Sequence, residues 1–125
     1  MISFTLTAQL PSGKNQIQRR THHYYDRTVV QAYPNKRFKL WREHAAKEVL
    51  TQVKAKAKDK PLTGPLVMNV QYVPQDKRTR DIPGMTDALF HLFEFCGLIE
   101  DDGQIQALSW ARALAGYTTI QLRPL

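Results

Sequence analysis

Alternating apolar and polar positions open the chain and predict its first strand. Residues 2–8 place Ile2, Phe4 and Leu6 on one face and polar side chains on the other, as in a half-buried strand. LVMNVQYV, residues 66–73, alternates in the same way, and shorter alternations at 104–112 and 117–123 predict two further strands around a turn at Gly116.

Two stretches follow a helical period instead. Apolar residues recur at three- and four-residue spacing between about Asn35 and Lys58, at Phe38, Trp41, Ala45, Val49 and Val53. A second stripe ends in Cys96 before Gly97, the natural helix stop, and contains Met85, Ala88, Leu89, Leu92 and Phe93. Phe90 and Phe95 fall outside this stripe, and they either widen the core face or form a second contact such as a subunit interface.

The segment LPSGKNQIQRRTHHYYDRT, residues 10–28, fits neither period, and its Gly, Pro, Gln and charge predict a long loop. Basic and aromatic residues alternate there, which suits an arm that contacts DNA, although a disordered polar loop has the same composition. The element order β-α-β-α-β-β predicts one α/β (α+β) domain over residues 1–125. We expect a small mixed sheet of about four strands and two main helices.

Charge divides the chain unequally. Residues 1–80 hold 16 Lys and Arg against 5 Asp and Glu, a net +11, whereas residues 81–125 hold 2 against 6, a net −4. Most individual Lys and Arg residues only keep a protein surface soluble. A basic segment of 80 residues followed by a compact acidic cluster nevertheless favours nucleic acid as the partner. No apolar run is long enough for a membrane span, and the single cysteine excludes an internal disulfide, so we expect a reducing cytoplasm.

Six of the eleven acidic residues lie between Asp81 and Asp102. Asp81 ends a strand-to-helix connection, and Asp101 and Asp102 follow the same helix. We expect the sheet to bring these carboxylates together at one edge. Mg²⁺ prefers a few carboxylates and several waters, so the cluster is a candidate magnesium site. The alternative is purely local, because Asp caps helices and Asp-Asp-Gly forms ordinary turns.

KRTRDIPGMTDALFHLFEFCGLIEDDGQI, residues 77–105, resembles the RusA family of Holliday junction resolvases, and the N-terminal strand, the Trp41-containing helix and the length agree with it. The resemblance implies a bacterial or phage-encoded crossover-junction endodeoxyribonuclease. Such an enzyme is a homodimer that nicks opposed strands of a four-way DNA junction in recombination and repair. It uses Mg²⁺, for which Mn²⁺ can substitute.

Carried over residue by residue, the resemblance implies that Asp81 and Asp102 are metal ligands, with Asp101 beside them. The family's second Asp falls on Pro83 and its lysine on Asp87. If Pro83 stands in the first helical turn, Asp87 lies on the same face and is a candidate for the missing carboxylate, as are Asp101 and Glu100. The alternative is a fold that binds junctions without cleaving them. The expected phosphate-binding residues are Lys14, Arg19, Arg20, Arg27, Lys77, Arg78 and Arg80.

Overall fold

The computed structural model describes residues 1–11, 17–23, 27–54, 61–74 and 81–125, and it describes no side chains for 17–20, 22, 29–34 and 54. Its main sheet contains β1 (Ile2–Leu6), β4 (Leu66–Tyr72), β5 (Ile105–Arg112) and β6 (Thr118–Pro124) in the order β1-β6-β4-β5. β6 pairs antiparallel with β1 and β4, whereas β5 pairs parallel with β4. The predicted mixed four-stranded sheet is therefore confirmed.

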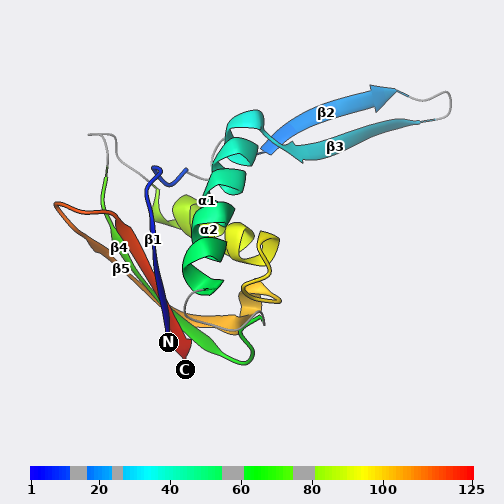
Figure 1. Ribbon diagram of the computed structural model, residues 1–125. Coiled ribbons are helices and arrows are strands. Elements are labelled where there is room, and N and C mark those ends of the chain that lie inside the picture. The colour runs from blue at the N-terminus through cyan, green and yellow to red at the C-terminus, as the bar shows by residue number, and fades with distance from the viewer. Residues whose placement is uncertain (12–16, 24–26, 55–60, 75–80) are drawn as a thin grey trace.

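Two helices, α1 (Lys36–Lys54) and α2 (Ile82–Phe95), cover one face of this sheet (Figure 1). The predicted stripe of α1 is buried at Phe38, Trp41, Ala45 and Val49, and Val53 packs at its margin. The expected end of this helix near Lys58 lies outside the described residues. Apolar periodicity thus located both helices correctly.

The core lies between the helices and the sheet. Phe4 of β1 meets Phe93 of α2 edge to face, with ring centroids 5.7 Å apart. Phe90 packs partly buried against the core, as the core-widening alternative predicted, while Phe95 stays 47% exposed. Cys96 is half-buried, and burial raises the pKa of its thiol. These contacts fix α2 across the sheet and hence the position of its two ends.

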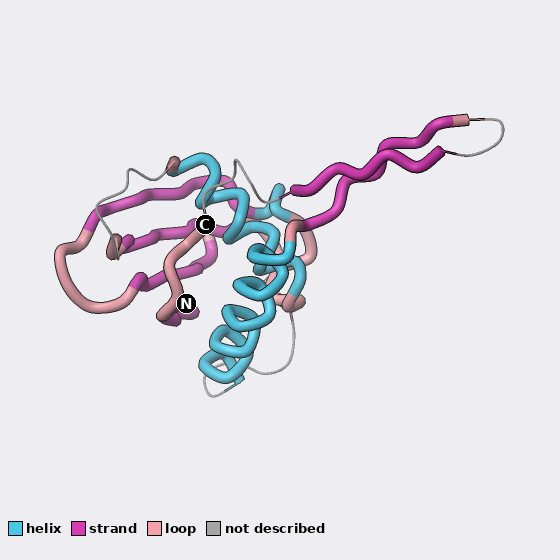
Figure 2. Tube along the Cα trace, turned by 90° about the horizontal axis from the view of Figure 1, so that it is seen from above, coloured by secondary structure: helices cyan, strands magenta, loops and turns pink. Residues whose placement is uncertain are grey.

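The prediction of a loop over residues 10–28 was wrong for residues 17–23 and 28, which lie in strands. β2 (Ile17–His23) and β3 (Thr28–Pro34) pair antiparallel and form a hairpin with a sheet of its own. Figures 1 and 2 show this hairpin projecting from the body beside the start of α1. β2, IQRRTHH, is mostly polar, and the apolar residues of β3, TVVQAYP, do not alternate with polar ones, so neither strand has the pattern by which strands are recognised.

Candidate acidic metal site

The end of α2 folds back on itself and sets up a cluster of carboxylates. Gly97 adopts a φ of 73°, and the N–H groups of Gly97 and Leu98 return to the carbonyls of Glu94 and Phe93. Glycine takes this left-handed conformation without steric cost, so the helix can end here. The chain then turns into the short 3-10 helix η2 (Asp102–Gln104), which leads directly into β5.

Glu94, Asp101 and Asp102 form what we call the acidic group. One carboxylate oxygen from each lies within 4.8 Å of the others, and all three side chains are exposed. Glu94 Oε1 accepts a hydrogen bond from the N–H of Asp102 at 2.7 Å, and Asp101 Oδ2 accepts one from the N–H of Gly103 at 3.1 Å. The backbone of the loop therefore holds two of the three carboxylates in place.

Gln104 fixes the same loop to the rest of the protein. Its Oε1 accepts hydrogen bonds from the N–H groups of Glu100 and Asp101, at 2.8 and 3.1 Å. Its Nε2 donates to the carbonyls of Leu62 and Gly64, at 2.9 and 3.1 Å. A single amide thus ties the acidic loop to the segment that precedes β4.

The acidic group fits a hydrated divalent cation. Mg²⁺ binds oxygen at about 2.0–2.1 Å, so its ligand oxygens stand no more than about 4.2 Å apart. The observed spread of up to 4.8 Å needs only a small adjustment of exposed side chains, or a water between one carboxylate and the ion. Exposure also leaves room for the waters that Mg²⁺ retains and for a phosphate oxygen.

The structure does not bring Asp81 or Asp87 to the acidic group. Because β4 and β5 are parallel, α2 spans the sheet between them, and its two ends lie at opposite ends of the strands. Asp81 stands at the N-cap of α2, about 20 Å from Glu94 at 1.5 Å per helical residue. The expected convergence of Asp81 with Asp102 at one sheet edge is thus not found within this chain.

Local details around Asp81 bear on the capping alternative. The Asp81 side chain makes no capping hydrogen bond, so its carboxylate is not explained as a cap. Pro83 does stand in the first turn, as the displaced-carboxylate hypothesis requires. Asp87 is exposed one turn further along, but two turns, about 10 Å, still separate it from Glu94. Within the described part of the chain Glu100 is not a member of the acidic group, and its backbone N–H donates to Gln104.

A cationic and aromatic cluster flanks Glu94 on the side of α1. Arg42 Nη1 lies 3.0 Å from His91 Nε2, and the Arg42 guanidinium lies 4.1 Å from the centroid of the Phe95 ring. Arginine can only donate, so His91 Nε2 accepts and the neutral ring carries its proton on Nδ1. Burial and the charge of Arg42 lower the pKa of His91, against an opposing effect of Glu94.

Sequence reasoning missed Glu94, Arg42 and His91. Glu94 is one of the six acidic residues between Asp81 and Asp102, but it was not singled out, because it lies in a helix whose pattern is dominated by its apolar stripe. The signal that could have found it is Gly97, since a reversal right after a helix returns the following residues to its last turn. Arg42 and His91 are far apart in sequence, and no local pattern predicts their contact.

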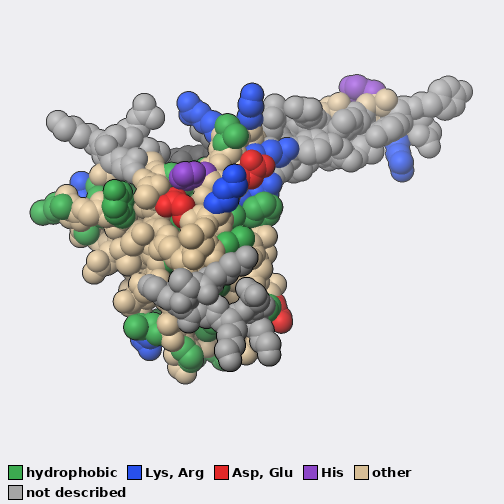
Figure 3. Space-filling model, viewed as in Figure 1, with side chains coloured by type: hydrophobic (Ala, Val, Ile, Leu, Met, Phe, Trp, Pro, Cys, Tyr) green, Lys and Arg blue, Asp and Glu red, His purple; other side chains and the backbone are tan. Residues whose placement is uncertain are grey.

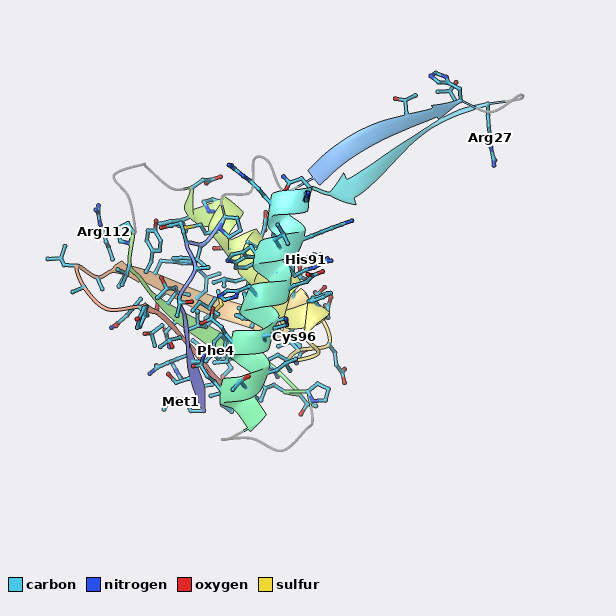
Figure 4. All side chains as sticks on the ribbon, turned by 45° about the horizontal axis from the view of Figure 1, so that its top comes forward. Met1, Phe4, Arg27, His91, Cys96 and Arg112 are labelled. Atoms are coloured by element: carbon cyan, nitrogen blue, oxygen red, sulfur yellow. The ribbon has the colours of Figure 1, made fainter. Side chains whose placement is uncertain are left out.

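The basic residues expected to bind phosphate fall into three sets. Arg27 is exposed at the far end of the hairpin (Figure 4). Arg19 and Arg20 are residues of β2. The other four lie outside the described residues: Lys14, Lys77, Arg78 and Arg80. Among the residues whose side chains are described, His23 of β2 belongs to no group that could hold a metal.

The sequence matches no protein-family model, and no curated protein is significantly similar to it. In the described part of the chain, neither helix has the length and apolar character that a membrane span requires. The function must therefore be inferred from the structure, which is a small mixed α/β fold with an exposed cluster of carboxylates.

Proposed function

We propose that this protein is a Mg²⁺-dependent, structure-selective DNA endonuclease that resolves four-way junctions by paired nicks in opposed strands. The observation that carries the proposal is the acidic group, three exposed carboxylates within 4.8 Å on a chain of net charge +7. Carboxylates beside a polyanion are unfavourable unless a cation lies between them, and a metal-dependent nuclease places its cation there.

The projecting hairpin supports DNA as the partner. A two-stranded ribbon has a width that the major groove of B-DNA admits, and isolated hairpins gain little stability unless something packs against them. Arg27 stands at the outer end of the hairpin, where a groove or a phosphate backbone could be reached (Figure 4). The hairpin is thus suited to hold one arm of a branched substrate.

A second basic surface lies where the hairpin joins the body. Figure 3 shows Lys and Arg side chains gathered over this region. The first turns of α1 supply three exposed cations there, Lys36, Arg37 and Lys39. Phosphate contacts of this kind position a duplex and carry little base information, so they suit recognition by shape.

At the acidic group, Glu94, Asp101 and Asp102 would hold the metal. When bound, Mg²⁺ supplies an activated water and neutralises charge on the scissile phosphate. The chain itself contributes a preformed arrangement, because the N–H groups of Asp102 and Gly103 orient two of the carboxylates before any ion arrives. Their exposure leaves the site open to a DNA strand.

A non-catalytic DNA-junction-binding protein is the second candidate. It is favoured by the same two hydrogen bonds, since they account for Glu94 and Asp101 as parts of a turn without a metal. Pro83, at the position where the resemblance to resolvases implies a carboxylate, favours it as well.

A junction-nicking assay with a Mg²⁺ series, repeated with Mn²⁺, distinguishes the two candidates. The endonuclease proposal expects paired nicks that require the metal, and it expects Asp102→Asn to abolish nicking while the junction still shifts on a gel. A junction that is shifted but never nicked with either metal would leave the binding protein. No shift with any DNA at low salt would eliminate both.

A further inference from the structure

One cation at the contact between the two helices has no anionic partner. Arg42 of α1 is half-buried, and within the described part of the chain the ion pair that forms joins His44 to Glu48 and leaves Arg42 out. Charged groups that are withdrawn from water are normally paired, because an unpaired charge loses hydration without compensation. Arg42 is therefore a candidate for binding an anion from outside the chain.

Two contacts orient the Arg42 guanidinium without neutralising it. Nη1 donates to Nε2 of His91, which lies beside α1 (Figure 4), at 3.0 Å. The guanidinium carbon lies 4.1 Å from the centroid of the Phe95 ring. Because His91 accepts from Arg42 it is neutral, in agreement with the lowering of its pKa by burial and by the charge of Arg42. A neutral imidazole and an aromatic ring thus hold the cation and leave its charge uncompensated.

One end of the guanidinium has donors to spare. Nη1 carries a second N–H besides the one that His91 accepts, and Nη2 carries two. Within the described residues Nη2 is neither buried nor hydrogen-bonded, whereas Nε is buried without a partner. Two adjacent N–H groups in one plane match two oxygens of a phosphate group, which is why arginine is favoured at phosphate sites. The free end of Arg42 therefore has the donors that a phosphate group needs.

This free cation lies on the same side of α2 as the acidic group. Residues three and four apart share a helical face, so His91, Glu94 and Phe95 are neighbours on α2. Arg42 contacts the first and the last of these three. Glu94 forms no ion pair with Arg42, and its Oε1 accepts from the N–H of Asp102 instead. An oriented cation and a candidate metal site are thus adjacent but separate.

Such an arrangement suits a phosphodiester, which spreads its negative charge over two oxygens. Phosphoryl-transfer sites commonly combine an arginine or lysine with a metal around one phosphate. We propose that Arg42 binds a phosphodiester group of the DNA strand that lies against the acidic group, with His91 and Phe95 holding its guanidinium in position. This role rests on the proposed function, since DNA is taken as the ligand, but binding without metal tests it separately from cleavage.

A purely structural role of Arg42 makes a different prediction. If Arg42 only joins α1 to α2, its replacement lowers the free energy of unfolding but leaves the folded protein's affinity for DNA unchanged. Junction binding in EDTA, measured by gel shift over a salt series, separates the two roles because no cleavage occurs there.

Arg42→Gln removes the charge from the contact. We expect it to weaken metal-free junction binding by at least about tenfold, as for loss of a hydrogen bond to a charged group. The slope of log K against log salt should fall by about one. Arg42→Lys keeps the charge without the planar fork, so it should restore the slope. Lys47→Gln is the matched control, because it removes an exposed cation from the same helix, and it should leave the slope unchanged.

NMR of the wild type gives a local measurement that needs no variant of Arg42. His91 Nε2 lies 3.0 Å from Nη1 of Arg42, so a phosphate bound there should shift the ring signals of His91 when metal-free junction DNA is added. His91→Gln assigns these signals. His44, two residues from Arg42 but paired with Glu48, is the internal control and should shift much less.

Several results would overturn the proposal. A folded Arg42→Gln variant, as checked by circular dichroism, that keeps the wild-type affinity and salt slope would do so. His91 signals that stay unchanged at saturating DNA would do so as well, as would a wild type that binds no DNA. Failure of the proposed function is distinguishable, because a wild type that binds DNA through Arg42 but never nicks it would refute cleavage and retain this phosphate contact.

Discussion

Glu94 Oε1 accepts a hydrogen bond from the backbone N–H of Asp102 across 2.7 Å, which joins the last turn of α2 to the loop after it. This bond has two consequences. It orients one carboxylate of the acidic group, and it uses only one of that carboxylate's two oxygens. The structural and the metal-binding roles of Glu94 can therefore be separated by experiment.

Glu94→Gln makes this separation. The amide oxygen of Gln can still accept from Asp102, so the loop and the stability of the protein should be preserved. Loss of one charge should weaken Mn²⁺ or Mg²⁺ binding by at least about tenfold, a typical effect of altering groups at a metal site. Calorimetric titration of the metal measures it. Unchanged affinity would exclude Glu94 as a ligand.

Asp81→Asn and Asp87→Asn are the matched controls for Glu94→Gln, because each replaces a carboxylate by an amide away from the acidic group. They lie about 20 and 10 Å from Glu94 along α2, beyond the Debye length of about 8 Å at physiological salt. We expect metal affinity to stay within about twofold of the wild type. A large loss of metal affinity in Asp87→Asn would support the hypothesis that Asp87 replaces the carboxylate missing at Pro83. A large loss in Asp81→Asn would show that Asp81 lies near the ion in the assembled protein.

The burial of His91, together with its contact with Arg42, should make folding stability depend on pH. The folded protein keeps His91 neutral with a pKa below its ordinary value of 6.5, whereas the unfolded chain binds a proton at about 6.5. The free energy of unfolding should therefore fall as the pH drops below 6.5, and level off below the folded pKa. Urea unfolding across this range measures the slope, and His91→Gln should reduce it.

NMR provides a direct check on the same contact. Because the charge of Arg42 helps to lower the pKa of His91, Arg42→Gln should raise that pKa. A His91 resonance that titrates identically in the variant would show that Arg42 has no such effect.

Gln52 protects the β1 edge, and Gln52→Ala should expose it. Two hydrogen bonds to the backbone of Thr5 are lost, and we expect the free energy of unfolding to fall by about 1–2 kcal/mol. The freed edge should also promote association at high concentration. Denaturant unfolding and light scattering measure the two effects. Thr51→Ala, at an exposed position on the same helix, should show neither.

Arg27 at the end of the hairpin should contribute to DNA affinity through one phosphate. Arg27→Ala should weaken binding to all junction sequences alike and lower the slope of log K against log salt by about one. Gel-shift titrations over a salt series measure this. Arg123→Ala removes another exposed cation, on β6, and an equal effect there would argue against the hairpin as the contact.

The sequence predicted those elements that bury an apolar face. The alternation in Ile2–Leu6 and the stripe from Met85 to Phe93 are signatures of partial burial, and both elements are found where expected. The hairpin β2–β3 carries no such signature, because β2, IQRRTHH, is mostly polar and the apolar residues of β3, TVVQAYP, do not alternate with polar ones.

The candidate site was predicted in part for a related reason. Asp101 and Asp102 are adjacent in sequence, so their proximity needed no knowledge of the fold. Whether Asp81 or Glu94 joins them depends on the direction of β5 relative to β4, which the local pattern does not encode. A parallel pairing sends Asp81 to the far end of the sheet, and the helix reversal at Gly97 supplies Glu94 instead.

The amide of Gln104 has a consequence for which side chains this position tolerates. Its oxygen meets two N–H groups and its nitrogen meets two carbonyls, so the head group is saturated and its orientation is fixed. A Glu of the same shape would direct a charged oxygen at the carbonyls of Leu62 and Gly64, and it could replace Gln only when protonated. In the sequence Asp-Asp-Gly-Gln, Gln104 therefore fixes the conformation of the loop, while the two preceding carboxylates remain available to bind a metal.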